Sequence, residues 1–264
     1  MLILRFSIRE KQILDSLNKY SILSSHELYQ RCFNGVSHTF MMKTLRDLIT
    51  KGMIYRVKGR YNEAHSFALT CRGAKGLGFN LPLSRVYWQT RYHDLAVNRV
   101  RFIFEDLGLG EKFISMRDLR LKKNDSILEA LGNVRGSDGV FFIPSEGGNE
   151  VVVMEVEVAQ KKPFEHRRIL SKFKDNSQVG IVLCFLASPA EYLTALTEWR
   201  NFEKSRSTKL YVVHLGEFLK FSGDARVRTL RGILPFHKAF NLRNWVSKVK
   251  ENEIDQKLLW SPSF

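Results

Sequence analysis

The sequence has no apolar run long enough to cross a membrane. A membrane helix needs roughly 18 apolar residues in succession, and the opening MLILRF is followed at once by polar and charged residues. Three cysteines, Cys32, Cys71 and Cys184, lack paired spacing, which argues against a disulfide framework or a cysteine zinc site. The zinc motif HExxH and the common phosphate-binding glycine motifs are also missing. We therefore expect a soluble, cytoplasmic protein that makes no membrane contact.

Acidic residues are scarce relative to basic ones, above all in the first third of the chain. The sequence holds 42 Lys and Arg against 27 Asp and Glu, which gives a formal net charge of +15. Residues 1 to 92 hold 15 basic against 5 acidic residues, so +10 of that charge lies there. Such an excess favours a polyanionic partner, and its position predicts that the first third binds nucleic acid.

The first third has the pattern of three short helices. Apolar residues recur at helical spacing over residues 8 to 20, and a serine at 24 or 25 can cap a second helix that reaches residue 32. Ser37 can cap a third helix, which ends at Gly52. The third helix would turn inward Met41, Leu45, Leu48 and Ile49, and would present outward Thr39, Lys43, Arg46 and Thr50.

A basic hairpin follows the third helix, with extended runs at residues 53–58 and 66–70. Three helices followed by such a hairpin resemble the winged-helix family, whose third helix enters the major groove while the hairpin lies along flanking phosphates. The resemblance implies double-stranded DNA as the partner. The expected contacts are Thr39, Lys43 and Arg46 on the helix, and Arg56, Lys58 and Arg60 on the hairpin. Winged helices also bind proteins, so a protein partner stays open.

Two carboxylates stand at the end of a strongly apolar strand in the second part of the chain. In VVVMEVEVAQKK, Glu155 and Glu157 share one face, and both faces begin apolar, as in a covered central strand. Burying carboxylates is unfavourable unless their charge is compensated. A tight turn would join this strand to the preceding one and bring Asp138 beside Glu155. Because Mg²⁺ accepts one or two protein carboxylates besides water and phosphate, Asp138 and Glu155 are candidate ligands for Mg²⁺ or Mn²⁺.

Residues 93–214 resemble the PD-(D/E)XK nuclease superfamily, in SDGVFF, in VVVMEVEVAQKK and in the basic helix PFEHRRILSKFK. In that superfamily the first acid and the first glutamate bind a metal that activates water, and a lysine two residues later assists. Here Ser137 replaces the proline and Glu157 stands at the lysine position, so Lys161 would supply the cation. The resemblance implies four catalytic residues, Asp138, Glu155, Glu157 and Lys161. A basic run follows them at Arg167, Arg168, Lys172 and Lys174.

The N-terminal winged helix, the segment YHDLAVNRVRF and the string EVEVAQK with the basic helix after it together resemble replication-relaxation proteins and MobC-type plasmid relaxases. This resemblance implies a nickase that acts in the mobilisation of DNA, with other relaxosome or transfer proteins as further partners. Two alternatives remain open. One is a catalytically inactive DNA-binding regulator that keeps the nuclease fold as a scaffold. The other is a subunit that is active only within a transfer or transposition complex.

The predicted fold class is α/β, in the broad sense that includes α+β, and the chain is divided into three parts. Residues 1–82 would form a winged helix-turn-helix domain. Residues 83–222 would form a mixed-sheet core like that of restriction endonucleases, in the order helix, three strands, helix, strand, helix, strand. Residues 223–264 would form a basic helical tail.

Overall fold

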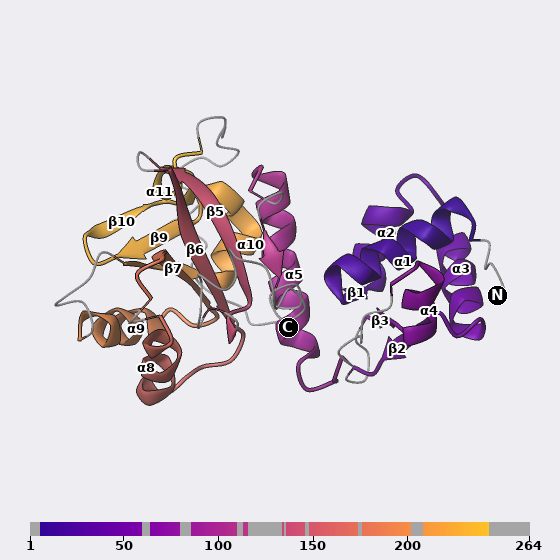
Figure 1. Ribbon diagram of the computed structural model, residues 1–264, viewed down its shortest axis with the longest axis horizontal. Helices are drawn as coiled ribbons and strands as arrows, with labels where there is room; N and C mark the ends of the chain where they lie inside the picture. The colour runs from indigo at the N-terminus through magenta and orange to yellow at the C-terminus, as the bar shows by residue number, and fades with distance from the viewer. Residues whose placement is uncertain are drawn as a thin grey trace. The chain divides into compact units, whose positions relative to one another are not determined.

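The computed structural model describes residues 6–59, 64–79, 86–109, 113–115, 134, 136–145, 148–173, 176–201 and 208–242. The chain divides into two compact units, an N-terminal unit (Met1–Asn98) and a C-terminal unit (Arg99–Phe264) (Figure 1). The first contains a three-stranded antiparallel sheet and the second a seven-stranded mixed sheet, each with helices. The predicted mixed α and β class is therefore confirmed. None of the described helices is long and apolar enough to span a membrane.

Helices and a small sheet alternate in the N-terminal unit. In chain order its elements are α1 (Ile8–Tyr20), β1 (Ile22–Ser24), α2 (Ser25–Cys32), α3 (His38–Thr50), β2 (Ile54–Val57), β3 (Ser66–Leu69) and α4 (Cys71–Gly76). β3 lies between β1 and β2 and is antiparallel to both. The three helices and the β2–β3 pair occupy the segments that the sequence predicts, and β1 adds a strand that the sequence pattern did not indicate.

Serine caps determine where the first helices begin. Ser7 accepts the amide of Glu10, whose carboxylate accepts the Ser7 amide in return, and Ser24 and Glu27 repeat this capping box at α2. At α3 the Ser37 hydroxyl accepts the amide of Phe40 at 3.3 Å. These bonds satisfy amides that the first turn of a helix leaves without partners. The start of each of these three helices therefore depends on a serine and on the residue three positions after it.

Helix α5 (Arg91–Asp106) begins in the N-terminal unit and ends in the C-terminal unit. Leu95, in its first half, packs in one cluster with Ile22 of β1. The side-chain amide of Asn98 donates to the carbonyl oxygens of Tyr20 (3.0 Å) and Ile22 (2.6 Å). Because these contacts join the start of α5 to the small sheet, the division falls after residue 98 and not at the predicted boundary after residue 82.

Replacing Asn98 by leucine should destabilise the N-terminal unit. Asn98 is buried and bonds two main-chain carbonyls, so its loss leaves buried acceptors without that donor, at a cost of about 1–3 kcal/mol. Hydrogen exchange of the β1 and β3 amides would report the loss as faster local opening. Asn98→Asp keeps the shape but removes the donor, so it should behave like the leucine variant. Exchange as slow as in the wild type would contradict the prediction.

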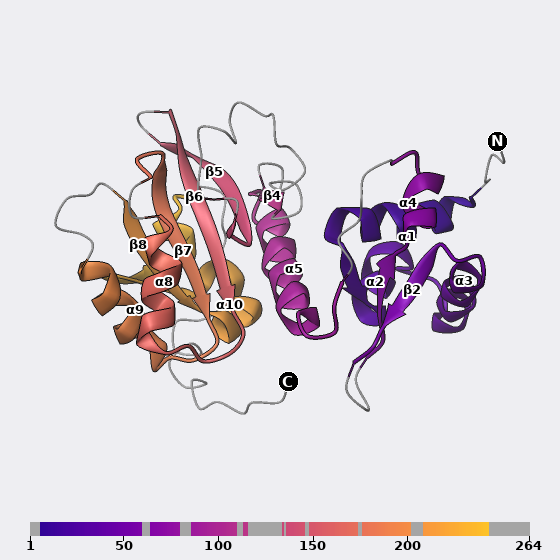
Figure 2. The ribbon, with the colours of Figure 1, turned by 60° about the horizontal axis from the view of Figure 1, so that its bottom comes forward.

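A seven-stranded sheet forms the centre of the C-terminal unit. Its strands are β4 (Ile114–Ser115), β5 (Gly139–Ser145), β6 (Gly148–Glu157), β7 (Val179–Leu186), β8 (Lys209–His214), β9 (Arg226–Thr229) and β10 (Gly232–Pro235). The order across the sheet is β10-β9-β8-β7-β6-β5-β4. β6, β7 and β8 are mutually parallel, and every other neighbouring pair is antiparallel. The helices described after β6 are α8 (Pro163–Ser171), α9 (Glu191–Arg200) and α10 (Leu215–Phe221) (Figure 2), and α11 (Phe236–Ala239) (Figure 1).

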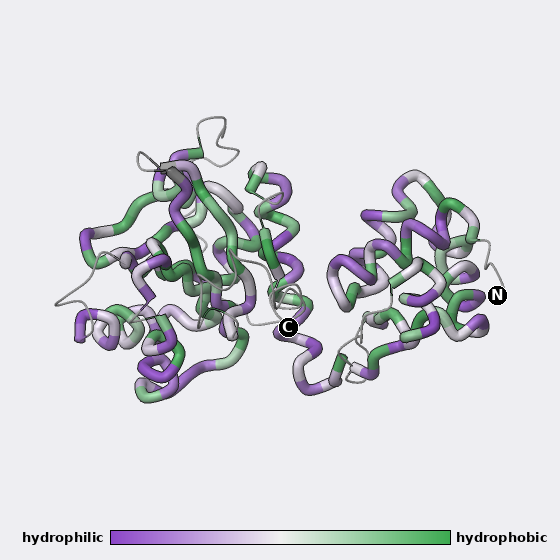
Figure 3. The backbone as a smooth tube through the Cα atoms, in the orientation of Figure 1, coloured by the Kyte–Doolittle hydropathy of each residue, from purple (hydrophilic) through white to green (hydrophobic). Residues whose placement is uncertain are grey.

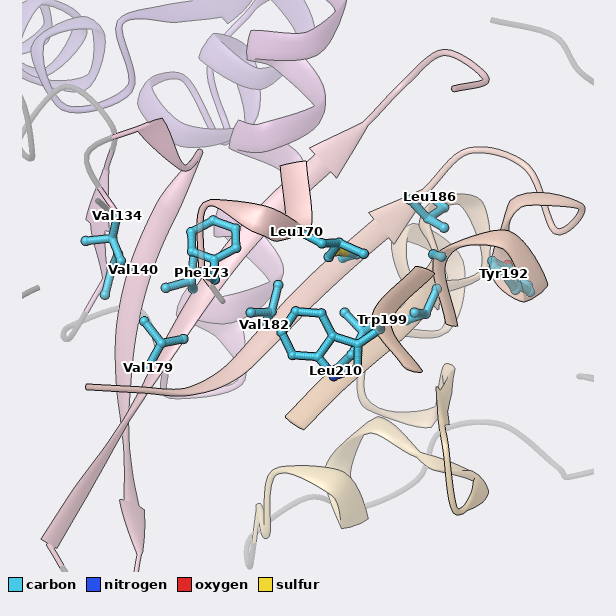
Figure 4. Close-up of a cluster of buried hydrophobic side chains, with 14 residues drawn as sticks. Val134, Val140, Leu170, Phe173, Val179, Val182, Leu186, Tyr192, Trp199 and Leu210 are labelled. Atoms are coloured by element: carbon cyan, nitrogen blue, oxygen red, sulfur yellow. The ribbon is translucent and has the colours of Figure 1, made fainter. Parts of the chain in front are cut away.

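Helices cover both faces of this sheet. On one face, which we refer to as the α8/α9 face, strand residues such as Val140 and Val182 pack with Phe173 and Trp199 (Figure 4). On the opposite face Phe104 of α5 is surrounded by other rings, namely Phe113, Phe141, Phe185, Phe218 and Phe236. The central strands are accordingly hydrophobic along most of their length (Figure 3). This agrees with the expectation that both faces of residues 151–156 are covered.

Residues 226–235 form an edge of the sheet, which corrects the prediction of a helical tail from residue 223. β9 pairs with β8, where Val227 lies opposite Val213, and β10 pairs with β9. Val227 is fully buried whereas Arg226 and Arg228 are only partly buried. The alternation of basic and apolar or hydroxyl residues in RVRT is typical of a half-buried strand. Residues 243–264 lie outside the described part of the chain.

His214, at the end of β8, links the start of α10 to the end of β7. Its Nδ1 accepts the amide of Glu217 at 3.1 Å, and its Nε2 lies 3.1 Å from the carbonyl oxygen of Ala187. Since Nδ1 accepts, Nε2 carries the proton and donates. Burial lowers the pKa of His214 below its usual 6.5, because desolvation penalises the charged imidazolium. The neutral ring is therefore the form that the folded C-terminal unit favours.

We expect this histidine to make the stability of the C-terminal unit depend on pH. Because the folded pKa of His214 is below the unfolded value, its contribution is complete above about pH 6.5 and is lost as the pH falls through the folded pKa. His214→Asn can still cap α10 but does not titrate. Urea denaturation at a series of pH values should show a steeper loss of unfolding free energy on acidification in the wild type than in this variant. Equal slopes would contradict the assignment.

Candidate functional site

Asp138 lies beside the Glu155 position where β5 begins. The amide of Asp138 donates to the carbonyl oxygen of Met154 at 3.1 Å, and its Oδ2 accepts the amide of Val156 at 2.7 Å. The two bonds fall on either side of Glu155, so they hold the Asp138 side chain against that position. Asp138 is 8% exposed and Glu155 is 5% exposed. The β5–β6 hairpin thus brings these two acids together, as the sequence predicts.

The turn before β5 fixes the backbone that carries Asp138. Ser137 is fully buried, and its hydroxyl donates to the carbonyl oxygen of Val134 at 2.7 Å. The amide of Ser137 donates to the same oxygen at 2.9 Å. A serine at this position therefore closes the turn with its own side chain, a contact that the proline of the nuclease motif could not make.

Two lysines contact the glutamates of β6. Lys172, directly after α8, places its Nζ 3.7 Å from Glu155 Oε1, and it donates to the carbonyl oxygen of Gly136 at 3.4 Å. Lys161, in the loop after β6, places its Nζ 3.1 Å from Glu157 Oε2. Glu155 and Glu157 are therefore each paired with a different lysine. Lys161 was expected beside the site, but the pattern placed Lys172 only in a basic run.

Cys184 of β7 lies next to these acids on the α8/α9 face. It is the register partner of Glu155, and its thiol belongs to the buried cluster under α8 and α9. Burial raises the pKa of the Cys184 thiol well above its usual range, and the charges of Glu155, Glu157 and Asp138 raise it further, against the effect of Lys172. Three carboxylates and one ammonium group thus act on the same thiol, which stays protonated beside them.

Asp138 and Glu155 have the chemistry of a two-carboxylate site for a hard cation. Mg²⁺ binds through one or two protein carboxylates and completes its coordination with water and phosphate, and the buried pair of Asp138 and Glu155 supplies that number of carboxylates. Across the described ranges, no group of three or more His, Cys, Asp or Glu side chains is placed to hold a metal ion together. Glu157, which is paired with Lys161, does not complete such a group. The fit is limited to the Asp138 and Glu155 pair.

Glu191, the first residue of α9, anchors the loop that carries Lys161. Its Oε1 accepts the main-chain amide of Lys161 at 2.6 Å and lies 3.2 Å from Nε2 of His166. Both side chains are buried. The sequence analysis did not single out Glu191, and the available signal was an acid on the buried stripe of an amphipathic helix. The anchor joins α8, α9 and the end of β6 into one polar framework.

The basic run of α8 is only partly available to a ligand. Arg167 donates to both carboxylate oxygens of Glu198, at 2.7 and 3.2 Å, and Lys172 is engaged with Glu155. Arg168 is exposed to solvent. Lys174 lies outside the described residues. Ion pairs with α9 and with β6 therefore engage two cations of the basic run, Arg167 and Lys172.

Helix α3 exposes the polar face that its pattern predicts. Met41, Leu45 and Leu48 are buried and Ile49 is half-buried, whereas the outward positions are exposed, namely Thr39, Lys43, Arg46 and Thr50. Phe40, on the same helix, is 47% exposed. Its ring lies edge-on to that of buried Phe33, with centroids 6.3 Å apart. Sequence reasoning missed Phe40, because helical spacing alone does not separate a half-exposed aromatic residue from the core.

The hairpin after α3 carries further exposed cations. Arg56 of β2 and Lys58 directly after it are both exposed, while Val57 between them is buried. Alternation along an extended chain therefore turns both basic side chains away from the core. Arg60, the third expected contact of the hairpin, lies outside the described residues. The N-terminal unit thus presents cations on two consecutive elements, α3 and β2.

The predicted catalytic residues, Asp138, Glu155, Glu157 and Lys161, gather around the β5–β6 pair, and the described DNA-contact residues are exposed on the N-terminal unit. Comparison with protein-family models, with curated proteins and with solved structures gives no match. The chemistry of these residues is therefore the basis on which a function can be inferred.

Proposed function

We propose that this chain binds double-stranded DNA through its N-terminal unit and cuts a phosphodiester bond at Asp138 and Glu155, as a nickase in the processing or transfer of mobile DNA. The main support for this proposal is that the amide of Val156 donates to the buried Asp138 carboxylate and holds it beside the Glu155 position. Burying two carboxylates is unfavourable unless opposite charge or hydrogen bonds compensate them, and a divalent cation can add to the compensation that Lys172 and the Val156 amide provide. If the substrate is the DNA of mobile elements, the protein would act in the cytoplasm, where that DNA is processed.

The order α1-β1-α2-α3-β2-β3 supports DNA binding, because it is the order of a winged helix. In such folds the first residues of the third helix contact base edges, and the hairpin contacts phosphates. Lys43 and Arg46 are exposed on α3, and Arg56 and Lys58 on the hairpin. The excess of +10 over residues 1 to 92 would add sequence-independent attraction to the duplex.

The order of elements in the C-terminal unit supports cleavage. Helix α5, strands β4 to β6, helix α8 and strand β7 follow the order of the PD-(D/E)XK core, with Asp138 and Glu155 on its second and third strands. Bound Mg²⁺ or Mn²⁺ would supply a Lewis acid and a water of lowered pKa. Hydrogen bonding from Val156 keeps the Asp138 carboxylate in place, and Lys172 holds Glu155. Lys161 would offset negative charge that develops on the phosphate.

Duplex binding can be tested with the double variant Lys43→Ala/Arg46→Ala. If these side chains contact phosphates, the affinity should fall and the slope of log affinity against log salt should decrease by about one for each lost contact. Fluorescence anisotropy with a labelled duplex at several salt concentrations measures both. Lys11→Ala, which removes an exposed lysine from α1, is the matched control. An unchanged slope in the double variant would exclude α3 as the contact surface.

A second candidate is a DNA-binding regulator, or a subunit of a transfer complex, that does not cleave. It is favoured by the pairing of Glu157 with Lys161 and by the finding that three-ligand groups are absent from the described residues. A nicking assay on supercoiled DNA from the chain's own genetic neighbourhood, with Mg²⁺ or Mn²⁺, separates the two. Nicks that disappear in Asp138→Asn support the nuclease. Intact plasmid with either metal, with and without transfer proteins, would exclude it and leave the binding module.

A further inference from the structure

The first turns of α8 expose an aromatic ring between two cations. Phe164 is 62% exposed, and both Lys162 and Arg168 are exposed. We refer to these three residues as the α8 patch. None of them belongs to the cleavage site or to the α3 surface described above.

The α8 patch has an excess of positive charge. Glu165, which follows Phe164 in the chain, is an acid beside the patch, and its Oε2 accepts the amide of Lys162 at 2.8 Å. That bond, followed by the charges of Lys161, Arg168 and Lys162, lowers the pKa of the Glu165 carboxyl. Lys161 is engaged with Glu157, so Lys162 and Arg168 face the single charge of Glu165. The charged residues near the ring therefore sum to one positive charge, which favours an anionic ligand.

We propose that the α8 patch binds single-stranded DNA, with Phe164 stacked on an unpaired base and with Lys162 and Arg168 on the adjoining phosphates. A base in a duplex is covered on both faces by its neighbours, so an exposed ring stacks on DNA only where a base is unpaired. Leu193 of α9 is 78% exposed but offers no ring. The aromatic character of Phe164, together with the charges beside it, is what distinguishes the patch from an ordinary exposed apolar residue.

The patch begins close to the acids along the chain. Lys162 follows Glu157 by five residues, and Glu191 holds the intervening loop through the amide of Lys161. A strand bound at the patch would lie next to the end of β6. This inference rests on the proposed function and specifies its substrate, which is DNA with unpaired bases at or beside the bond to be cut.

Binding can be measured in the full chain with a labelled oligothymidine of about 12 nucleotides, within the usual range of site sizes. EDTA is present, so neither a metal nor cleavage contributes. Phe164→Ala should weaken binding about 5- to 150-fold, which corresponds to the loss of one stacked base. Phe164→Trp should keep the affinity, and Leu193→Ala is the matched control on α9. Duplex affinity should be equal in all these variants.

A cross-linking experiment locates the contact in the unaltered protein. An oligonucleotide that carries 5-iodouracil should form its adduct at Phe164, as mapped by mass spectrometry. Equal affinities of the wild type and Phe164→Ala, or an adduct confined to other residues, would overturn the proposal. A single-strand affinity that falls in Lys43→Ala/Arg46→Ala but not in Phe164→Ala would assign the binding to α3 instead. Because no step requires cleavage, failure of the nicking assay leaves this result unaffected.

Discussion

Glu155→Gln should lower the rate of DNA cleavage by about 100-fold or more and leave the affinity for duplex DNA unchanged. The substitution keeps the shape of the side chain but removes the charge that would hold a cation beside Asp138, and it removes the ion pair with Lys172 at 3.7 Å. Disturbing residues that only support metal ligands already costs about 10- to 100-fold, so loss of a ligand should cost at least as much. Initial rates of plasmid nicking with Mg²⁺ measure the effect.

Glu150→Gln is the matched control for this prediction. Glu150 lies on the same strand, β6, and is also paired with a lysine, Lys209, at 3.1 Å, but its cross-strand neighbour is Ile143 and not Asp138. It should nick at the wild-type rate. Cleavage by Glu155→Gln at the wild-type rate would remove Glu155 from the site, whereas equal losses in both variants would indicate a defect of folding. Anisotropy with a duplex confirms that DNA binding is retained.

Phe104→Ala should cause the largest loss of stability in the C-terminal unit. Phe104 is fully buried, and its ring centroid lies 4.8 Å from that of Phe141, 5.7 Å from that of Phe218 and 6.0 Å from those of Phe185 and Phe236. Truncating such a residue leaves a cavity and costs about 3–5 kcal/mol. Whole domains are stable by only about 5–15 kcal/mol, so the variant would be close to unfolding. Urea denaturation followed by near-ultraviolet circular dichroism measures the shift.

Phe164→Ala provides the comparison, because it makes the same chemical change at an exposed position of the same unit. Surface substitutions usually change stability by less than about 0.5 kcal/mol. The two variants should therefore differ by several kcal/mol in unfolding free energy. Similar midpoints would show that the cluster around Phe104 is not the core of the unit, and the assignment of the two sheet faces would have to be revised.

Local patterns predicted much of the fold. Ser37 and a serine at 24 or 25 mark the starts of two helices in the sequence, and the structure has these caps at Ser24 and Ser37, because a cap depends on residues three positions away. Alternation placed Glu155 and Glu157 on one face of β6, and a short hairpin placed Asp138 beside Glu155. Each of these features involves neighbours along the chain or the closest possible pairing of two strands.

The partners of the charged side chains were decided by tertiary structure. Lys172 and Arg167 belong to one basic run in the sequence, yet one is drawn to Glu155 and the other to Glu198, which is 31 positions away. RVRT joins the sheet because β8 offers it an open edge, and Asn98 bonds a strand 76 positions earlier. The sequence alone determined which faces are apolar and where most helices and strands up to residue 214 lie, since periodicity is local, although β1 and β9 were not predicted as strands. Ion pairs and strand edges followed only from packing, because they depend on which distant segments the hydrophobic core brings together.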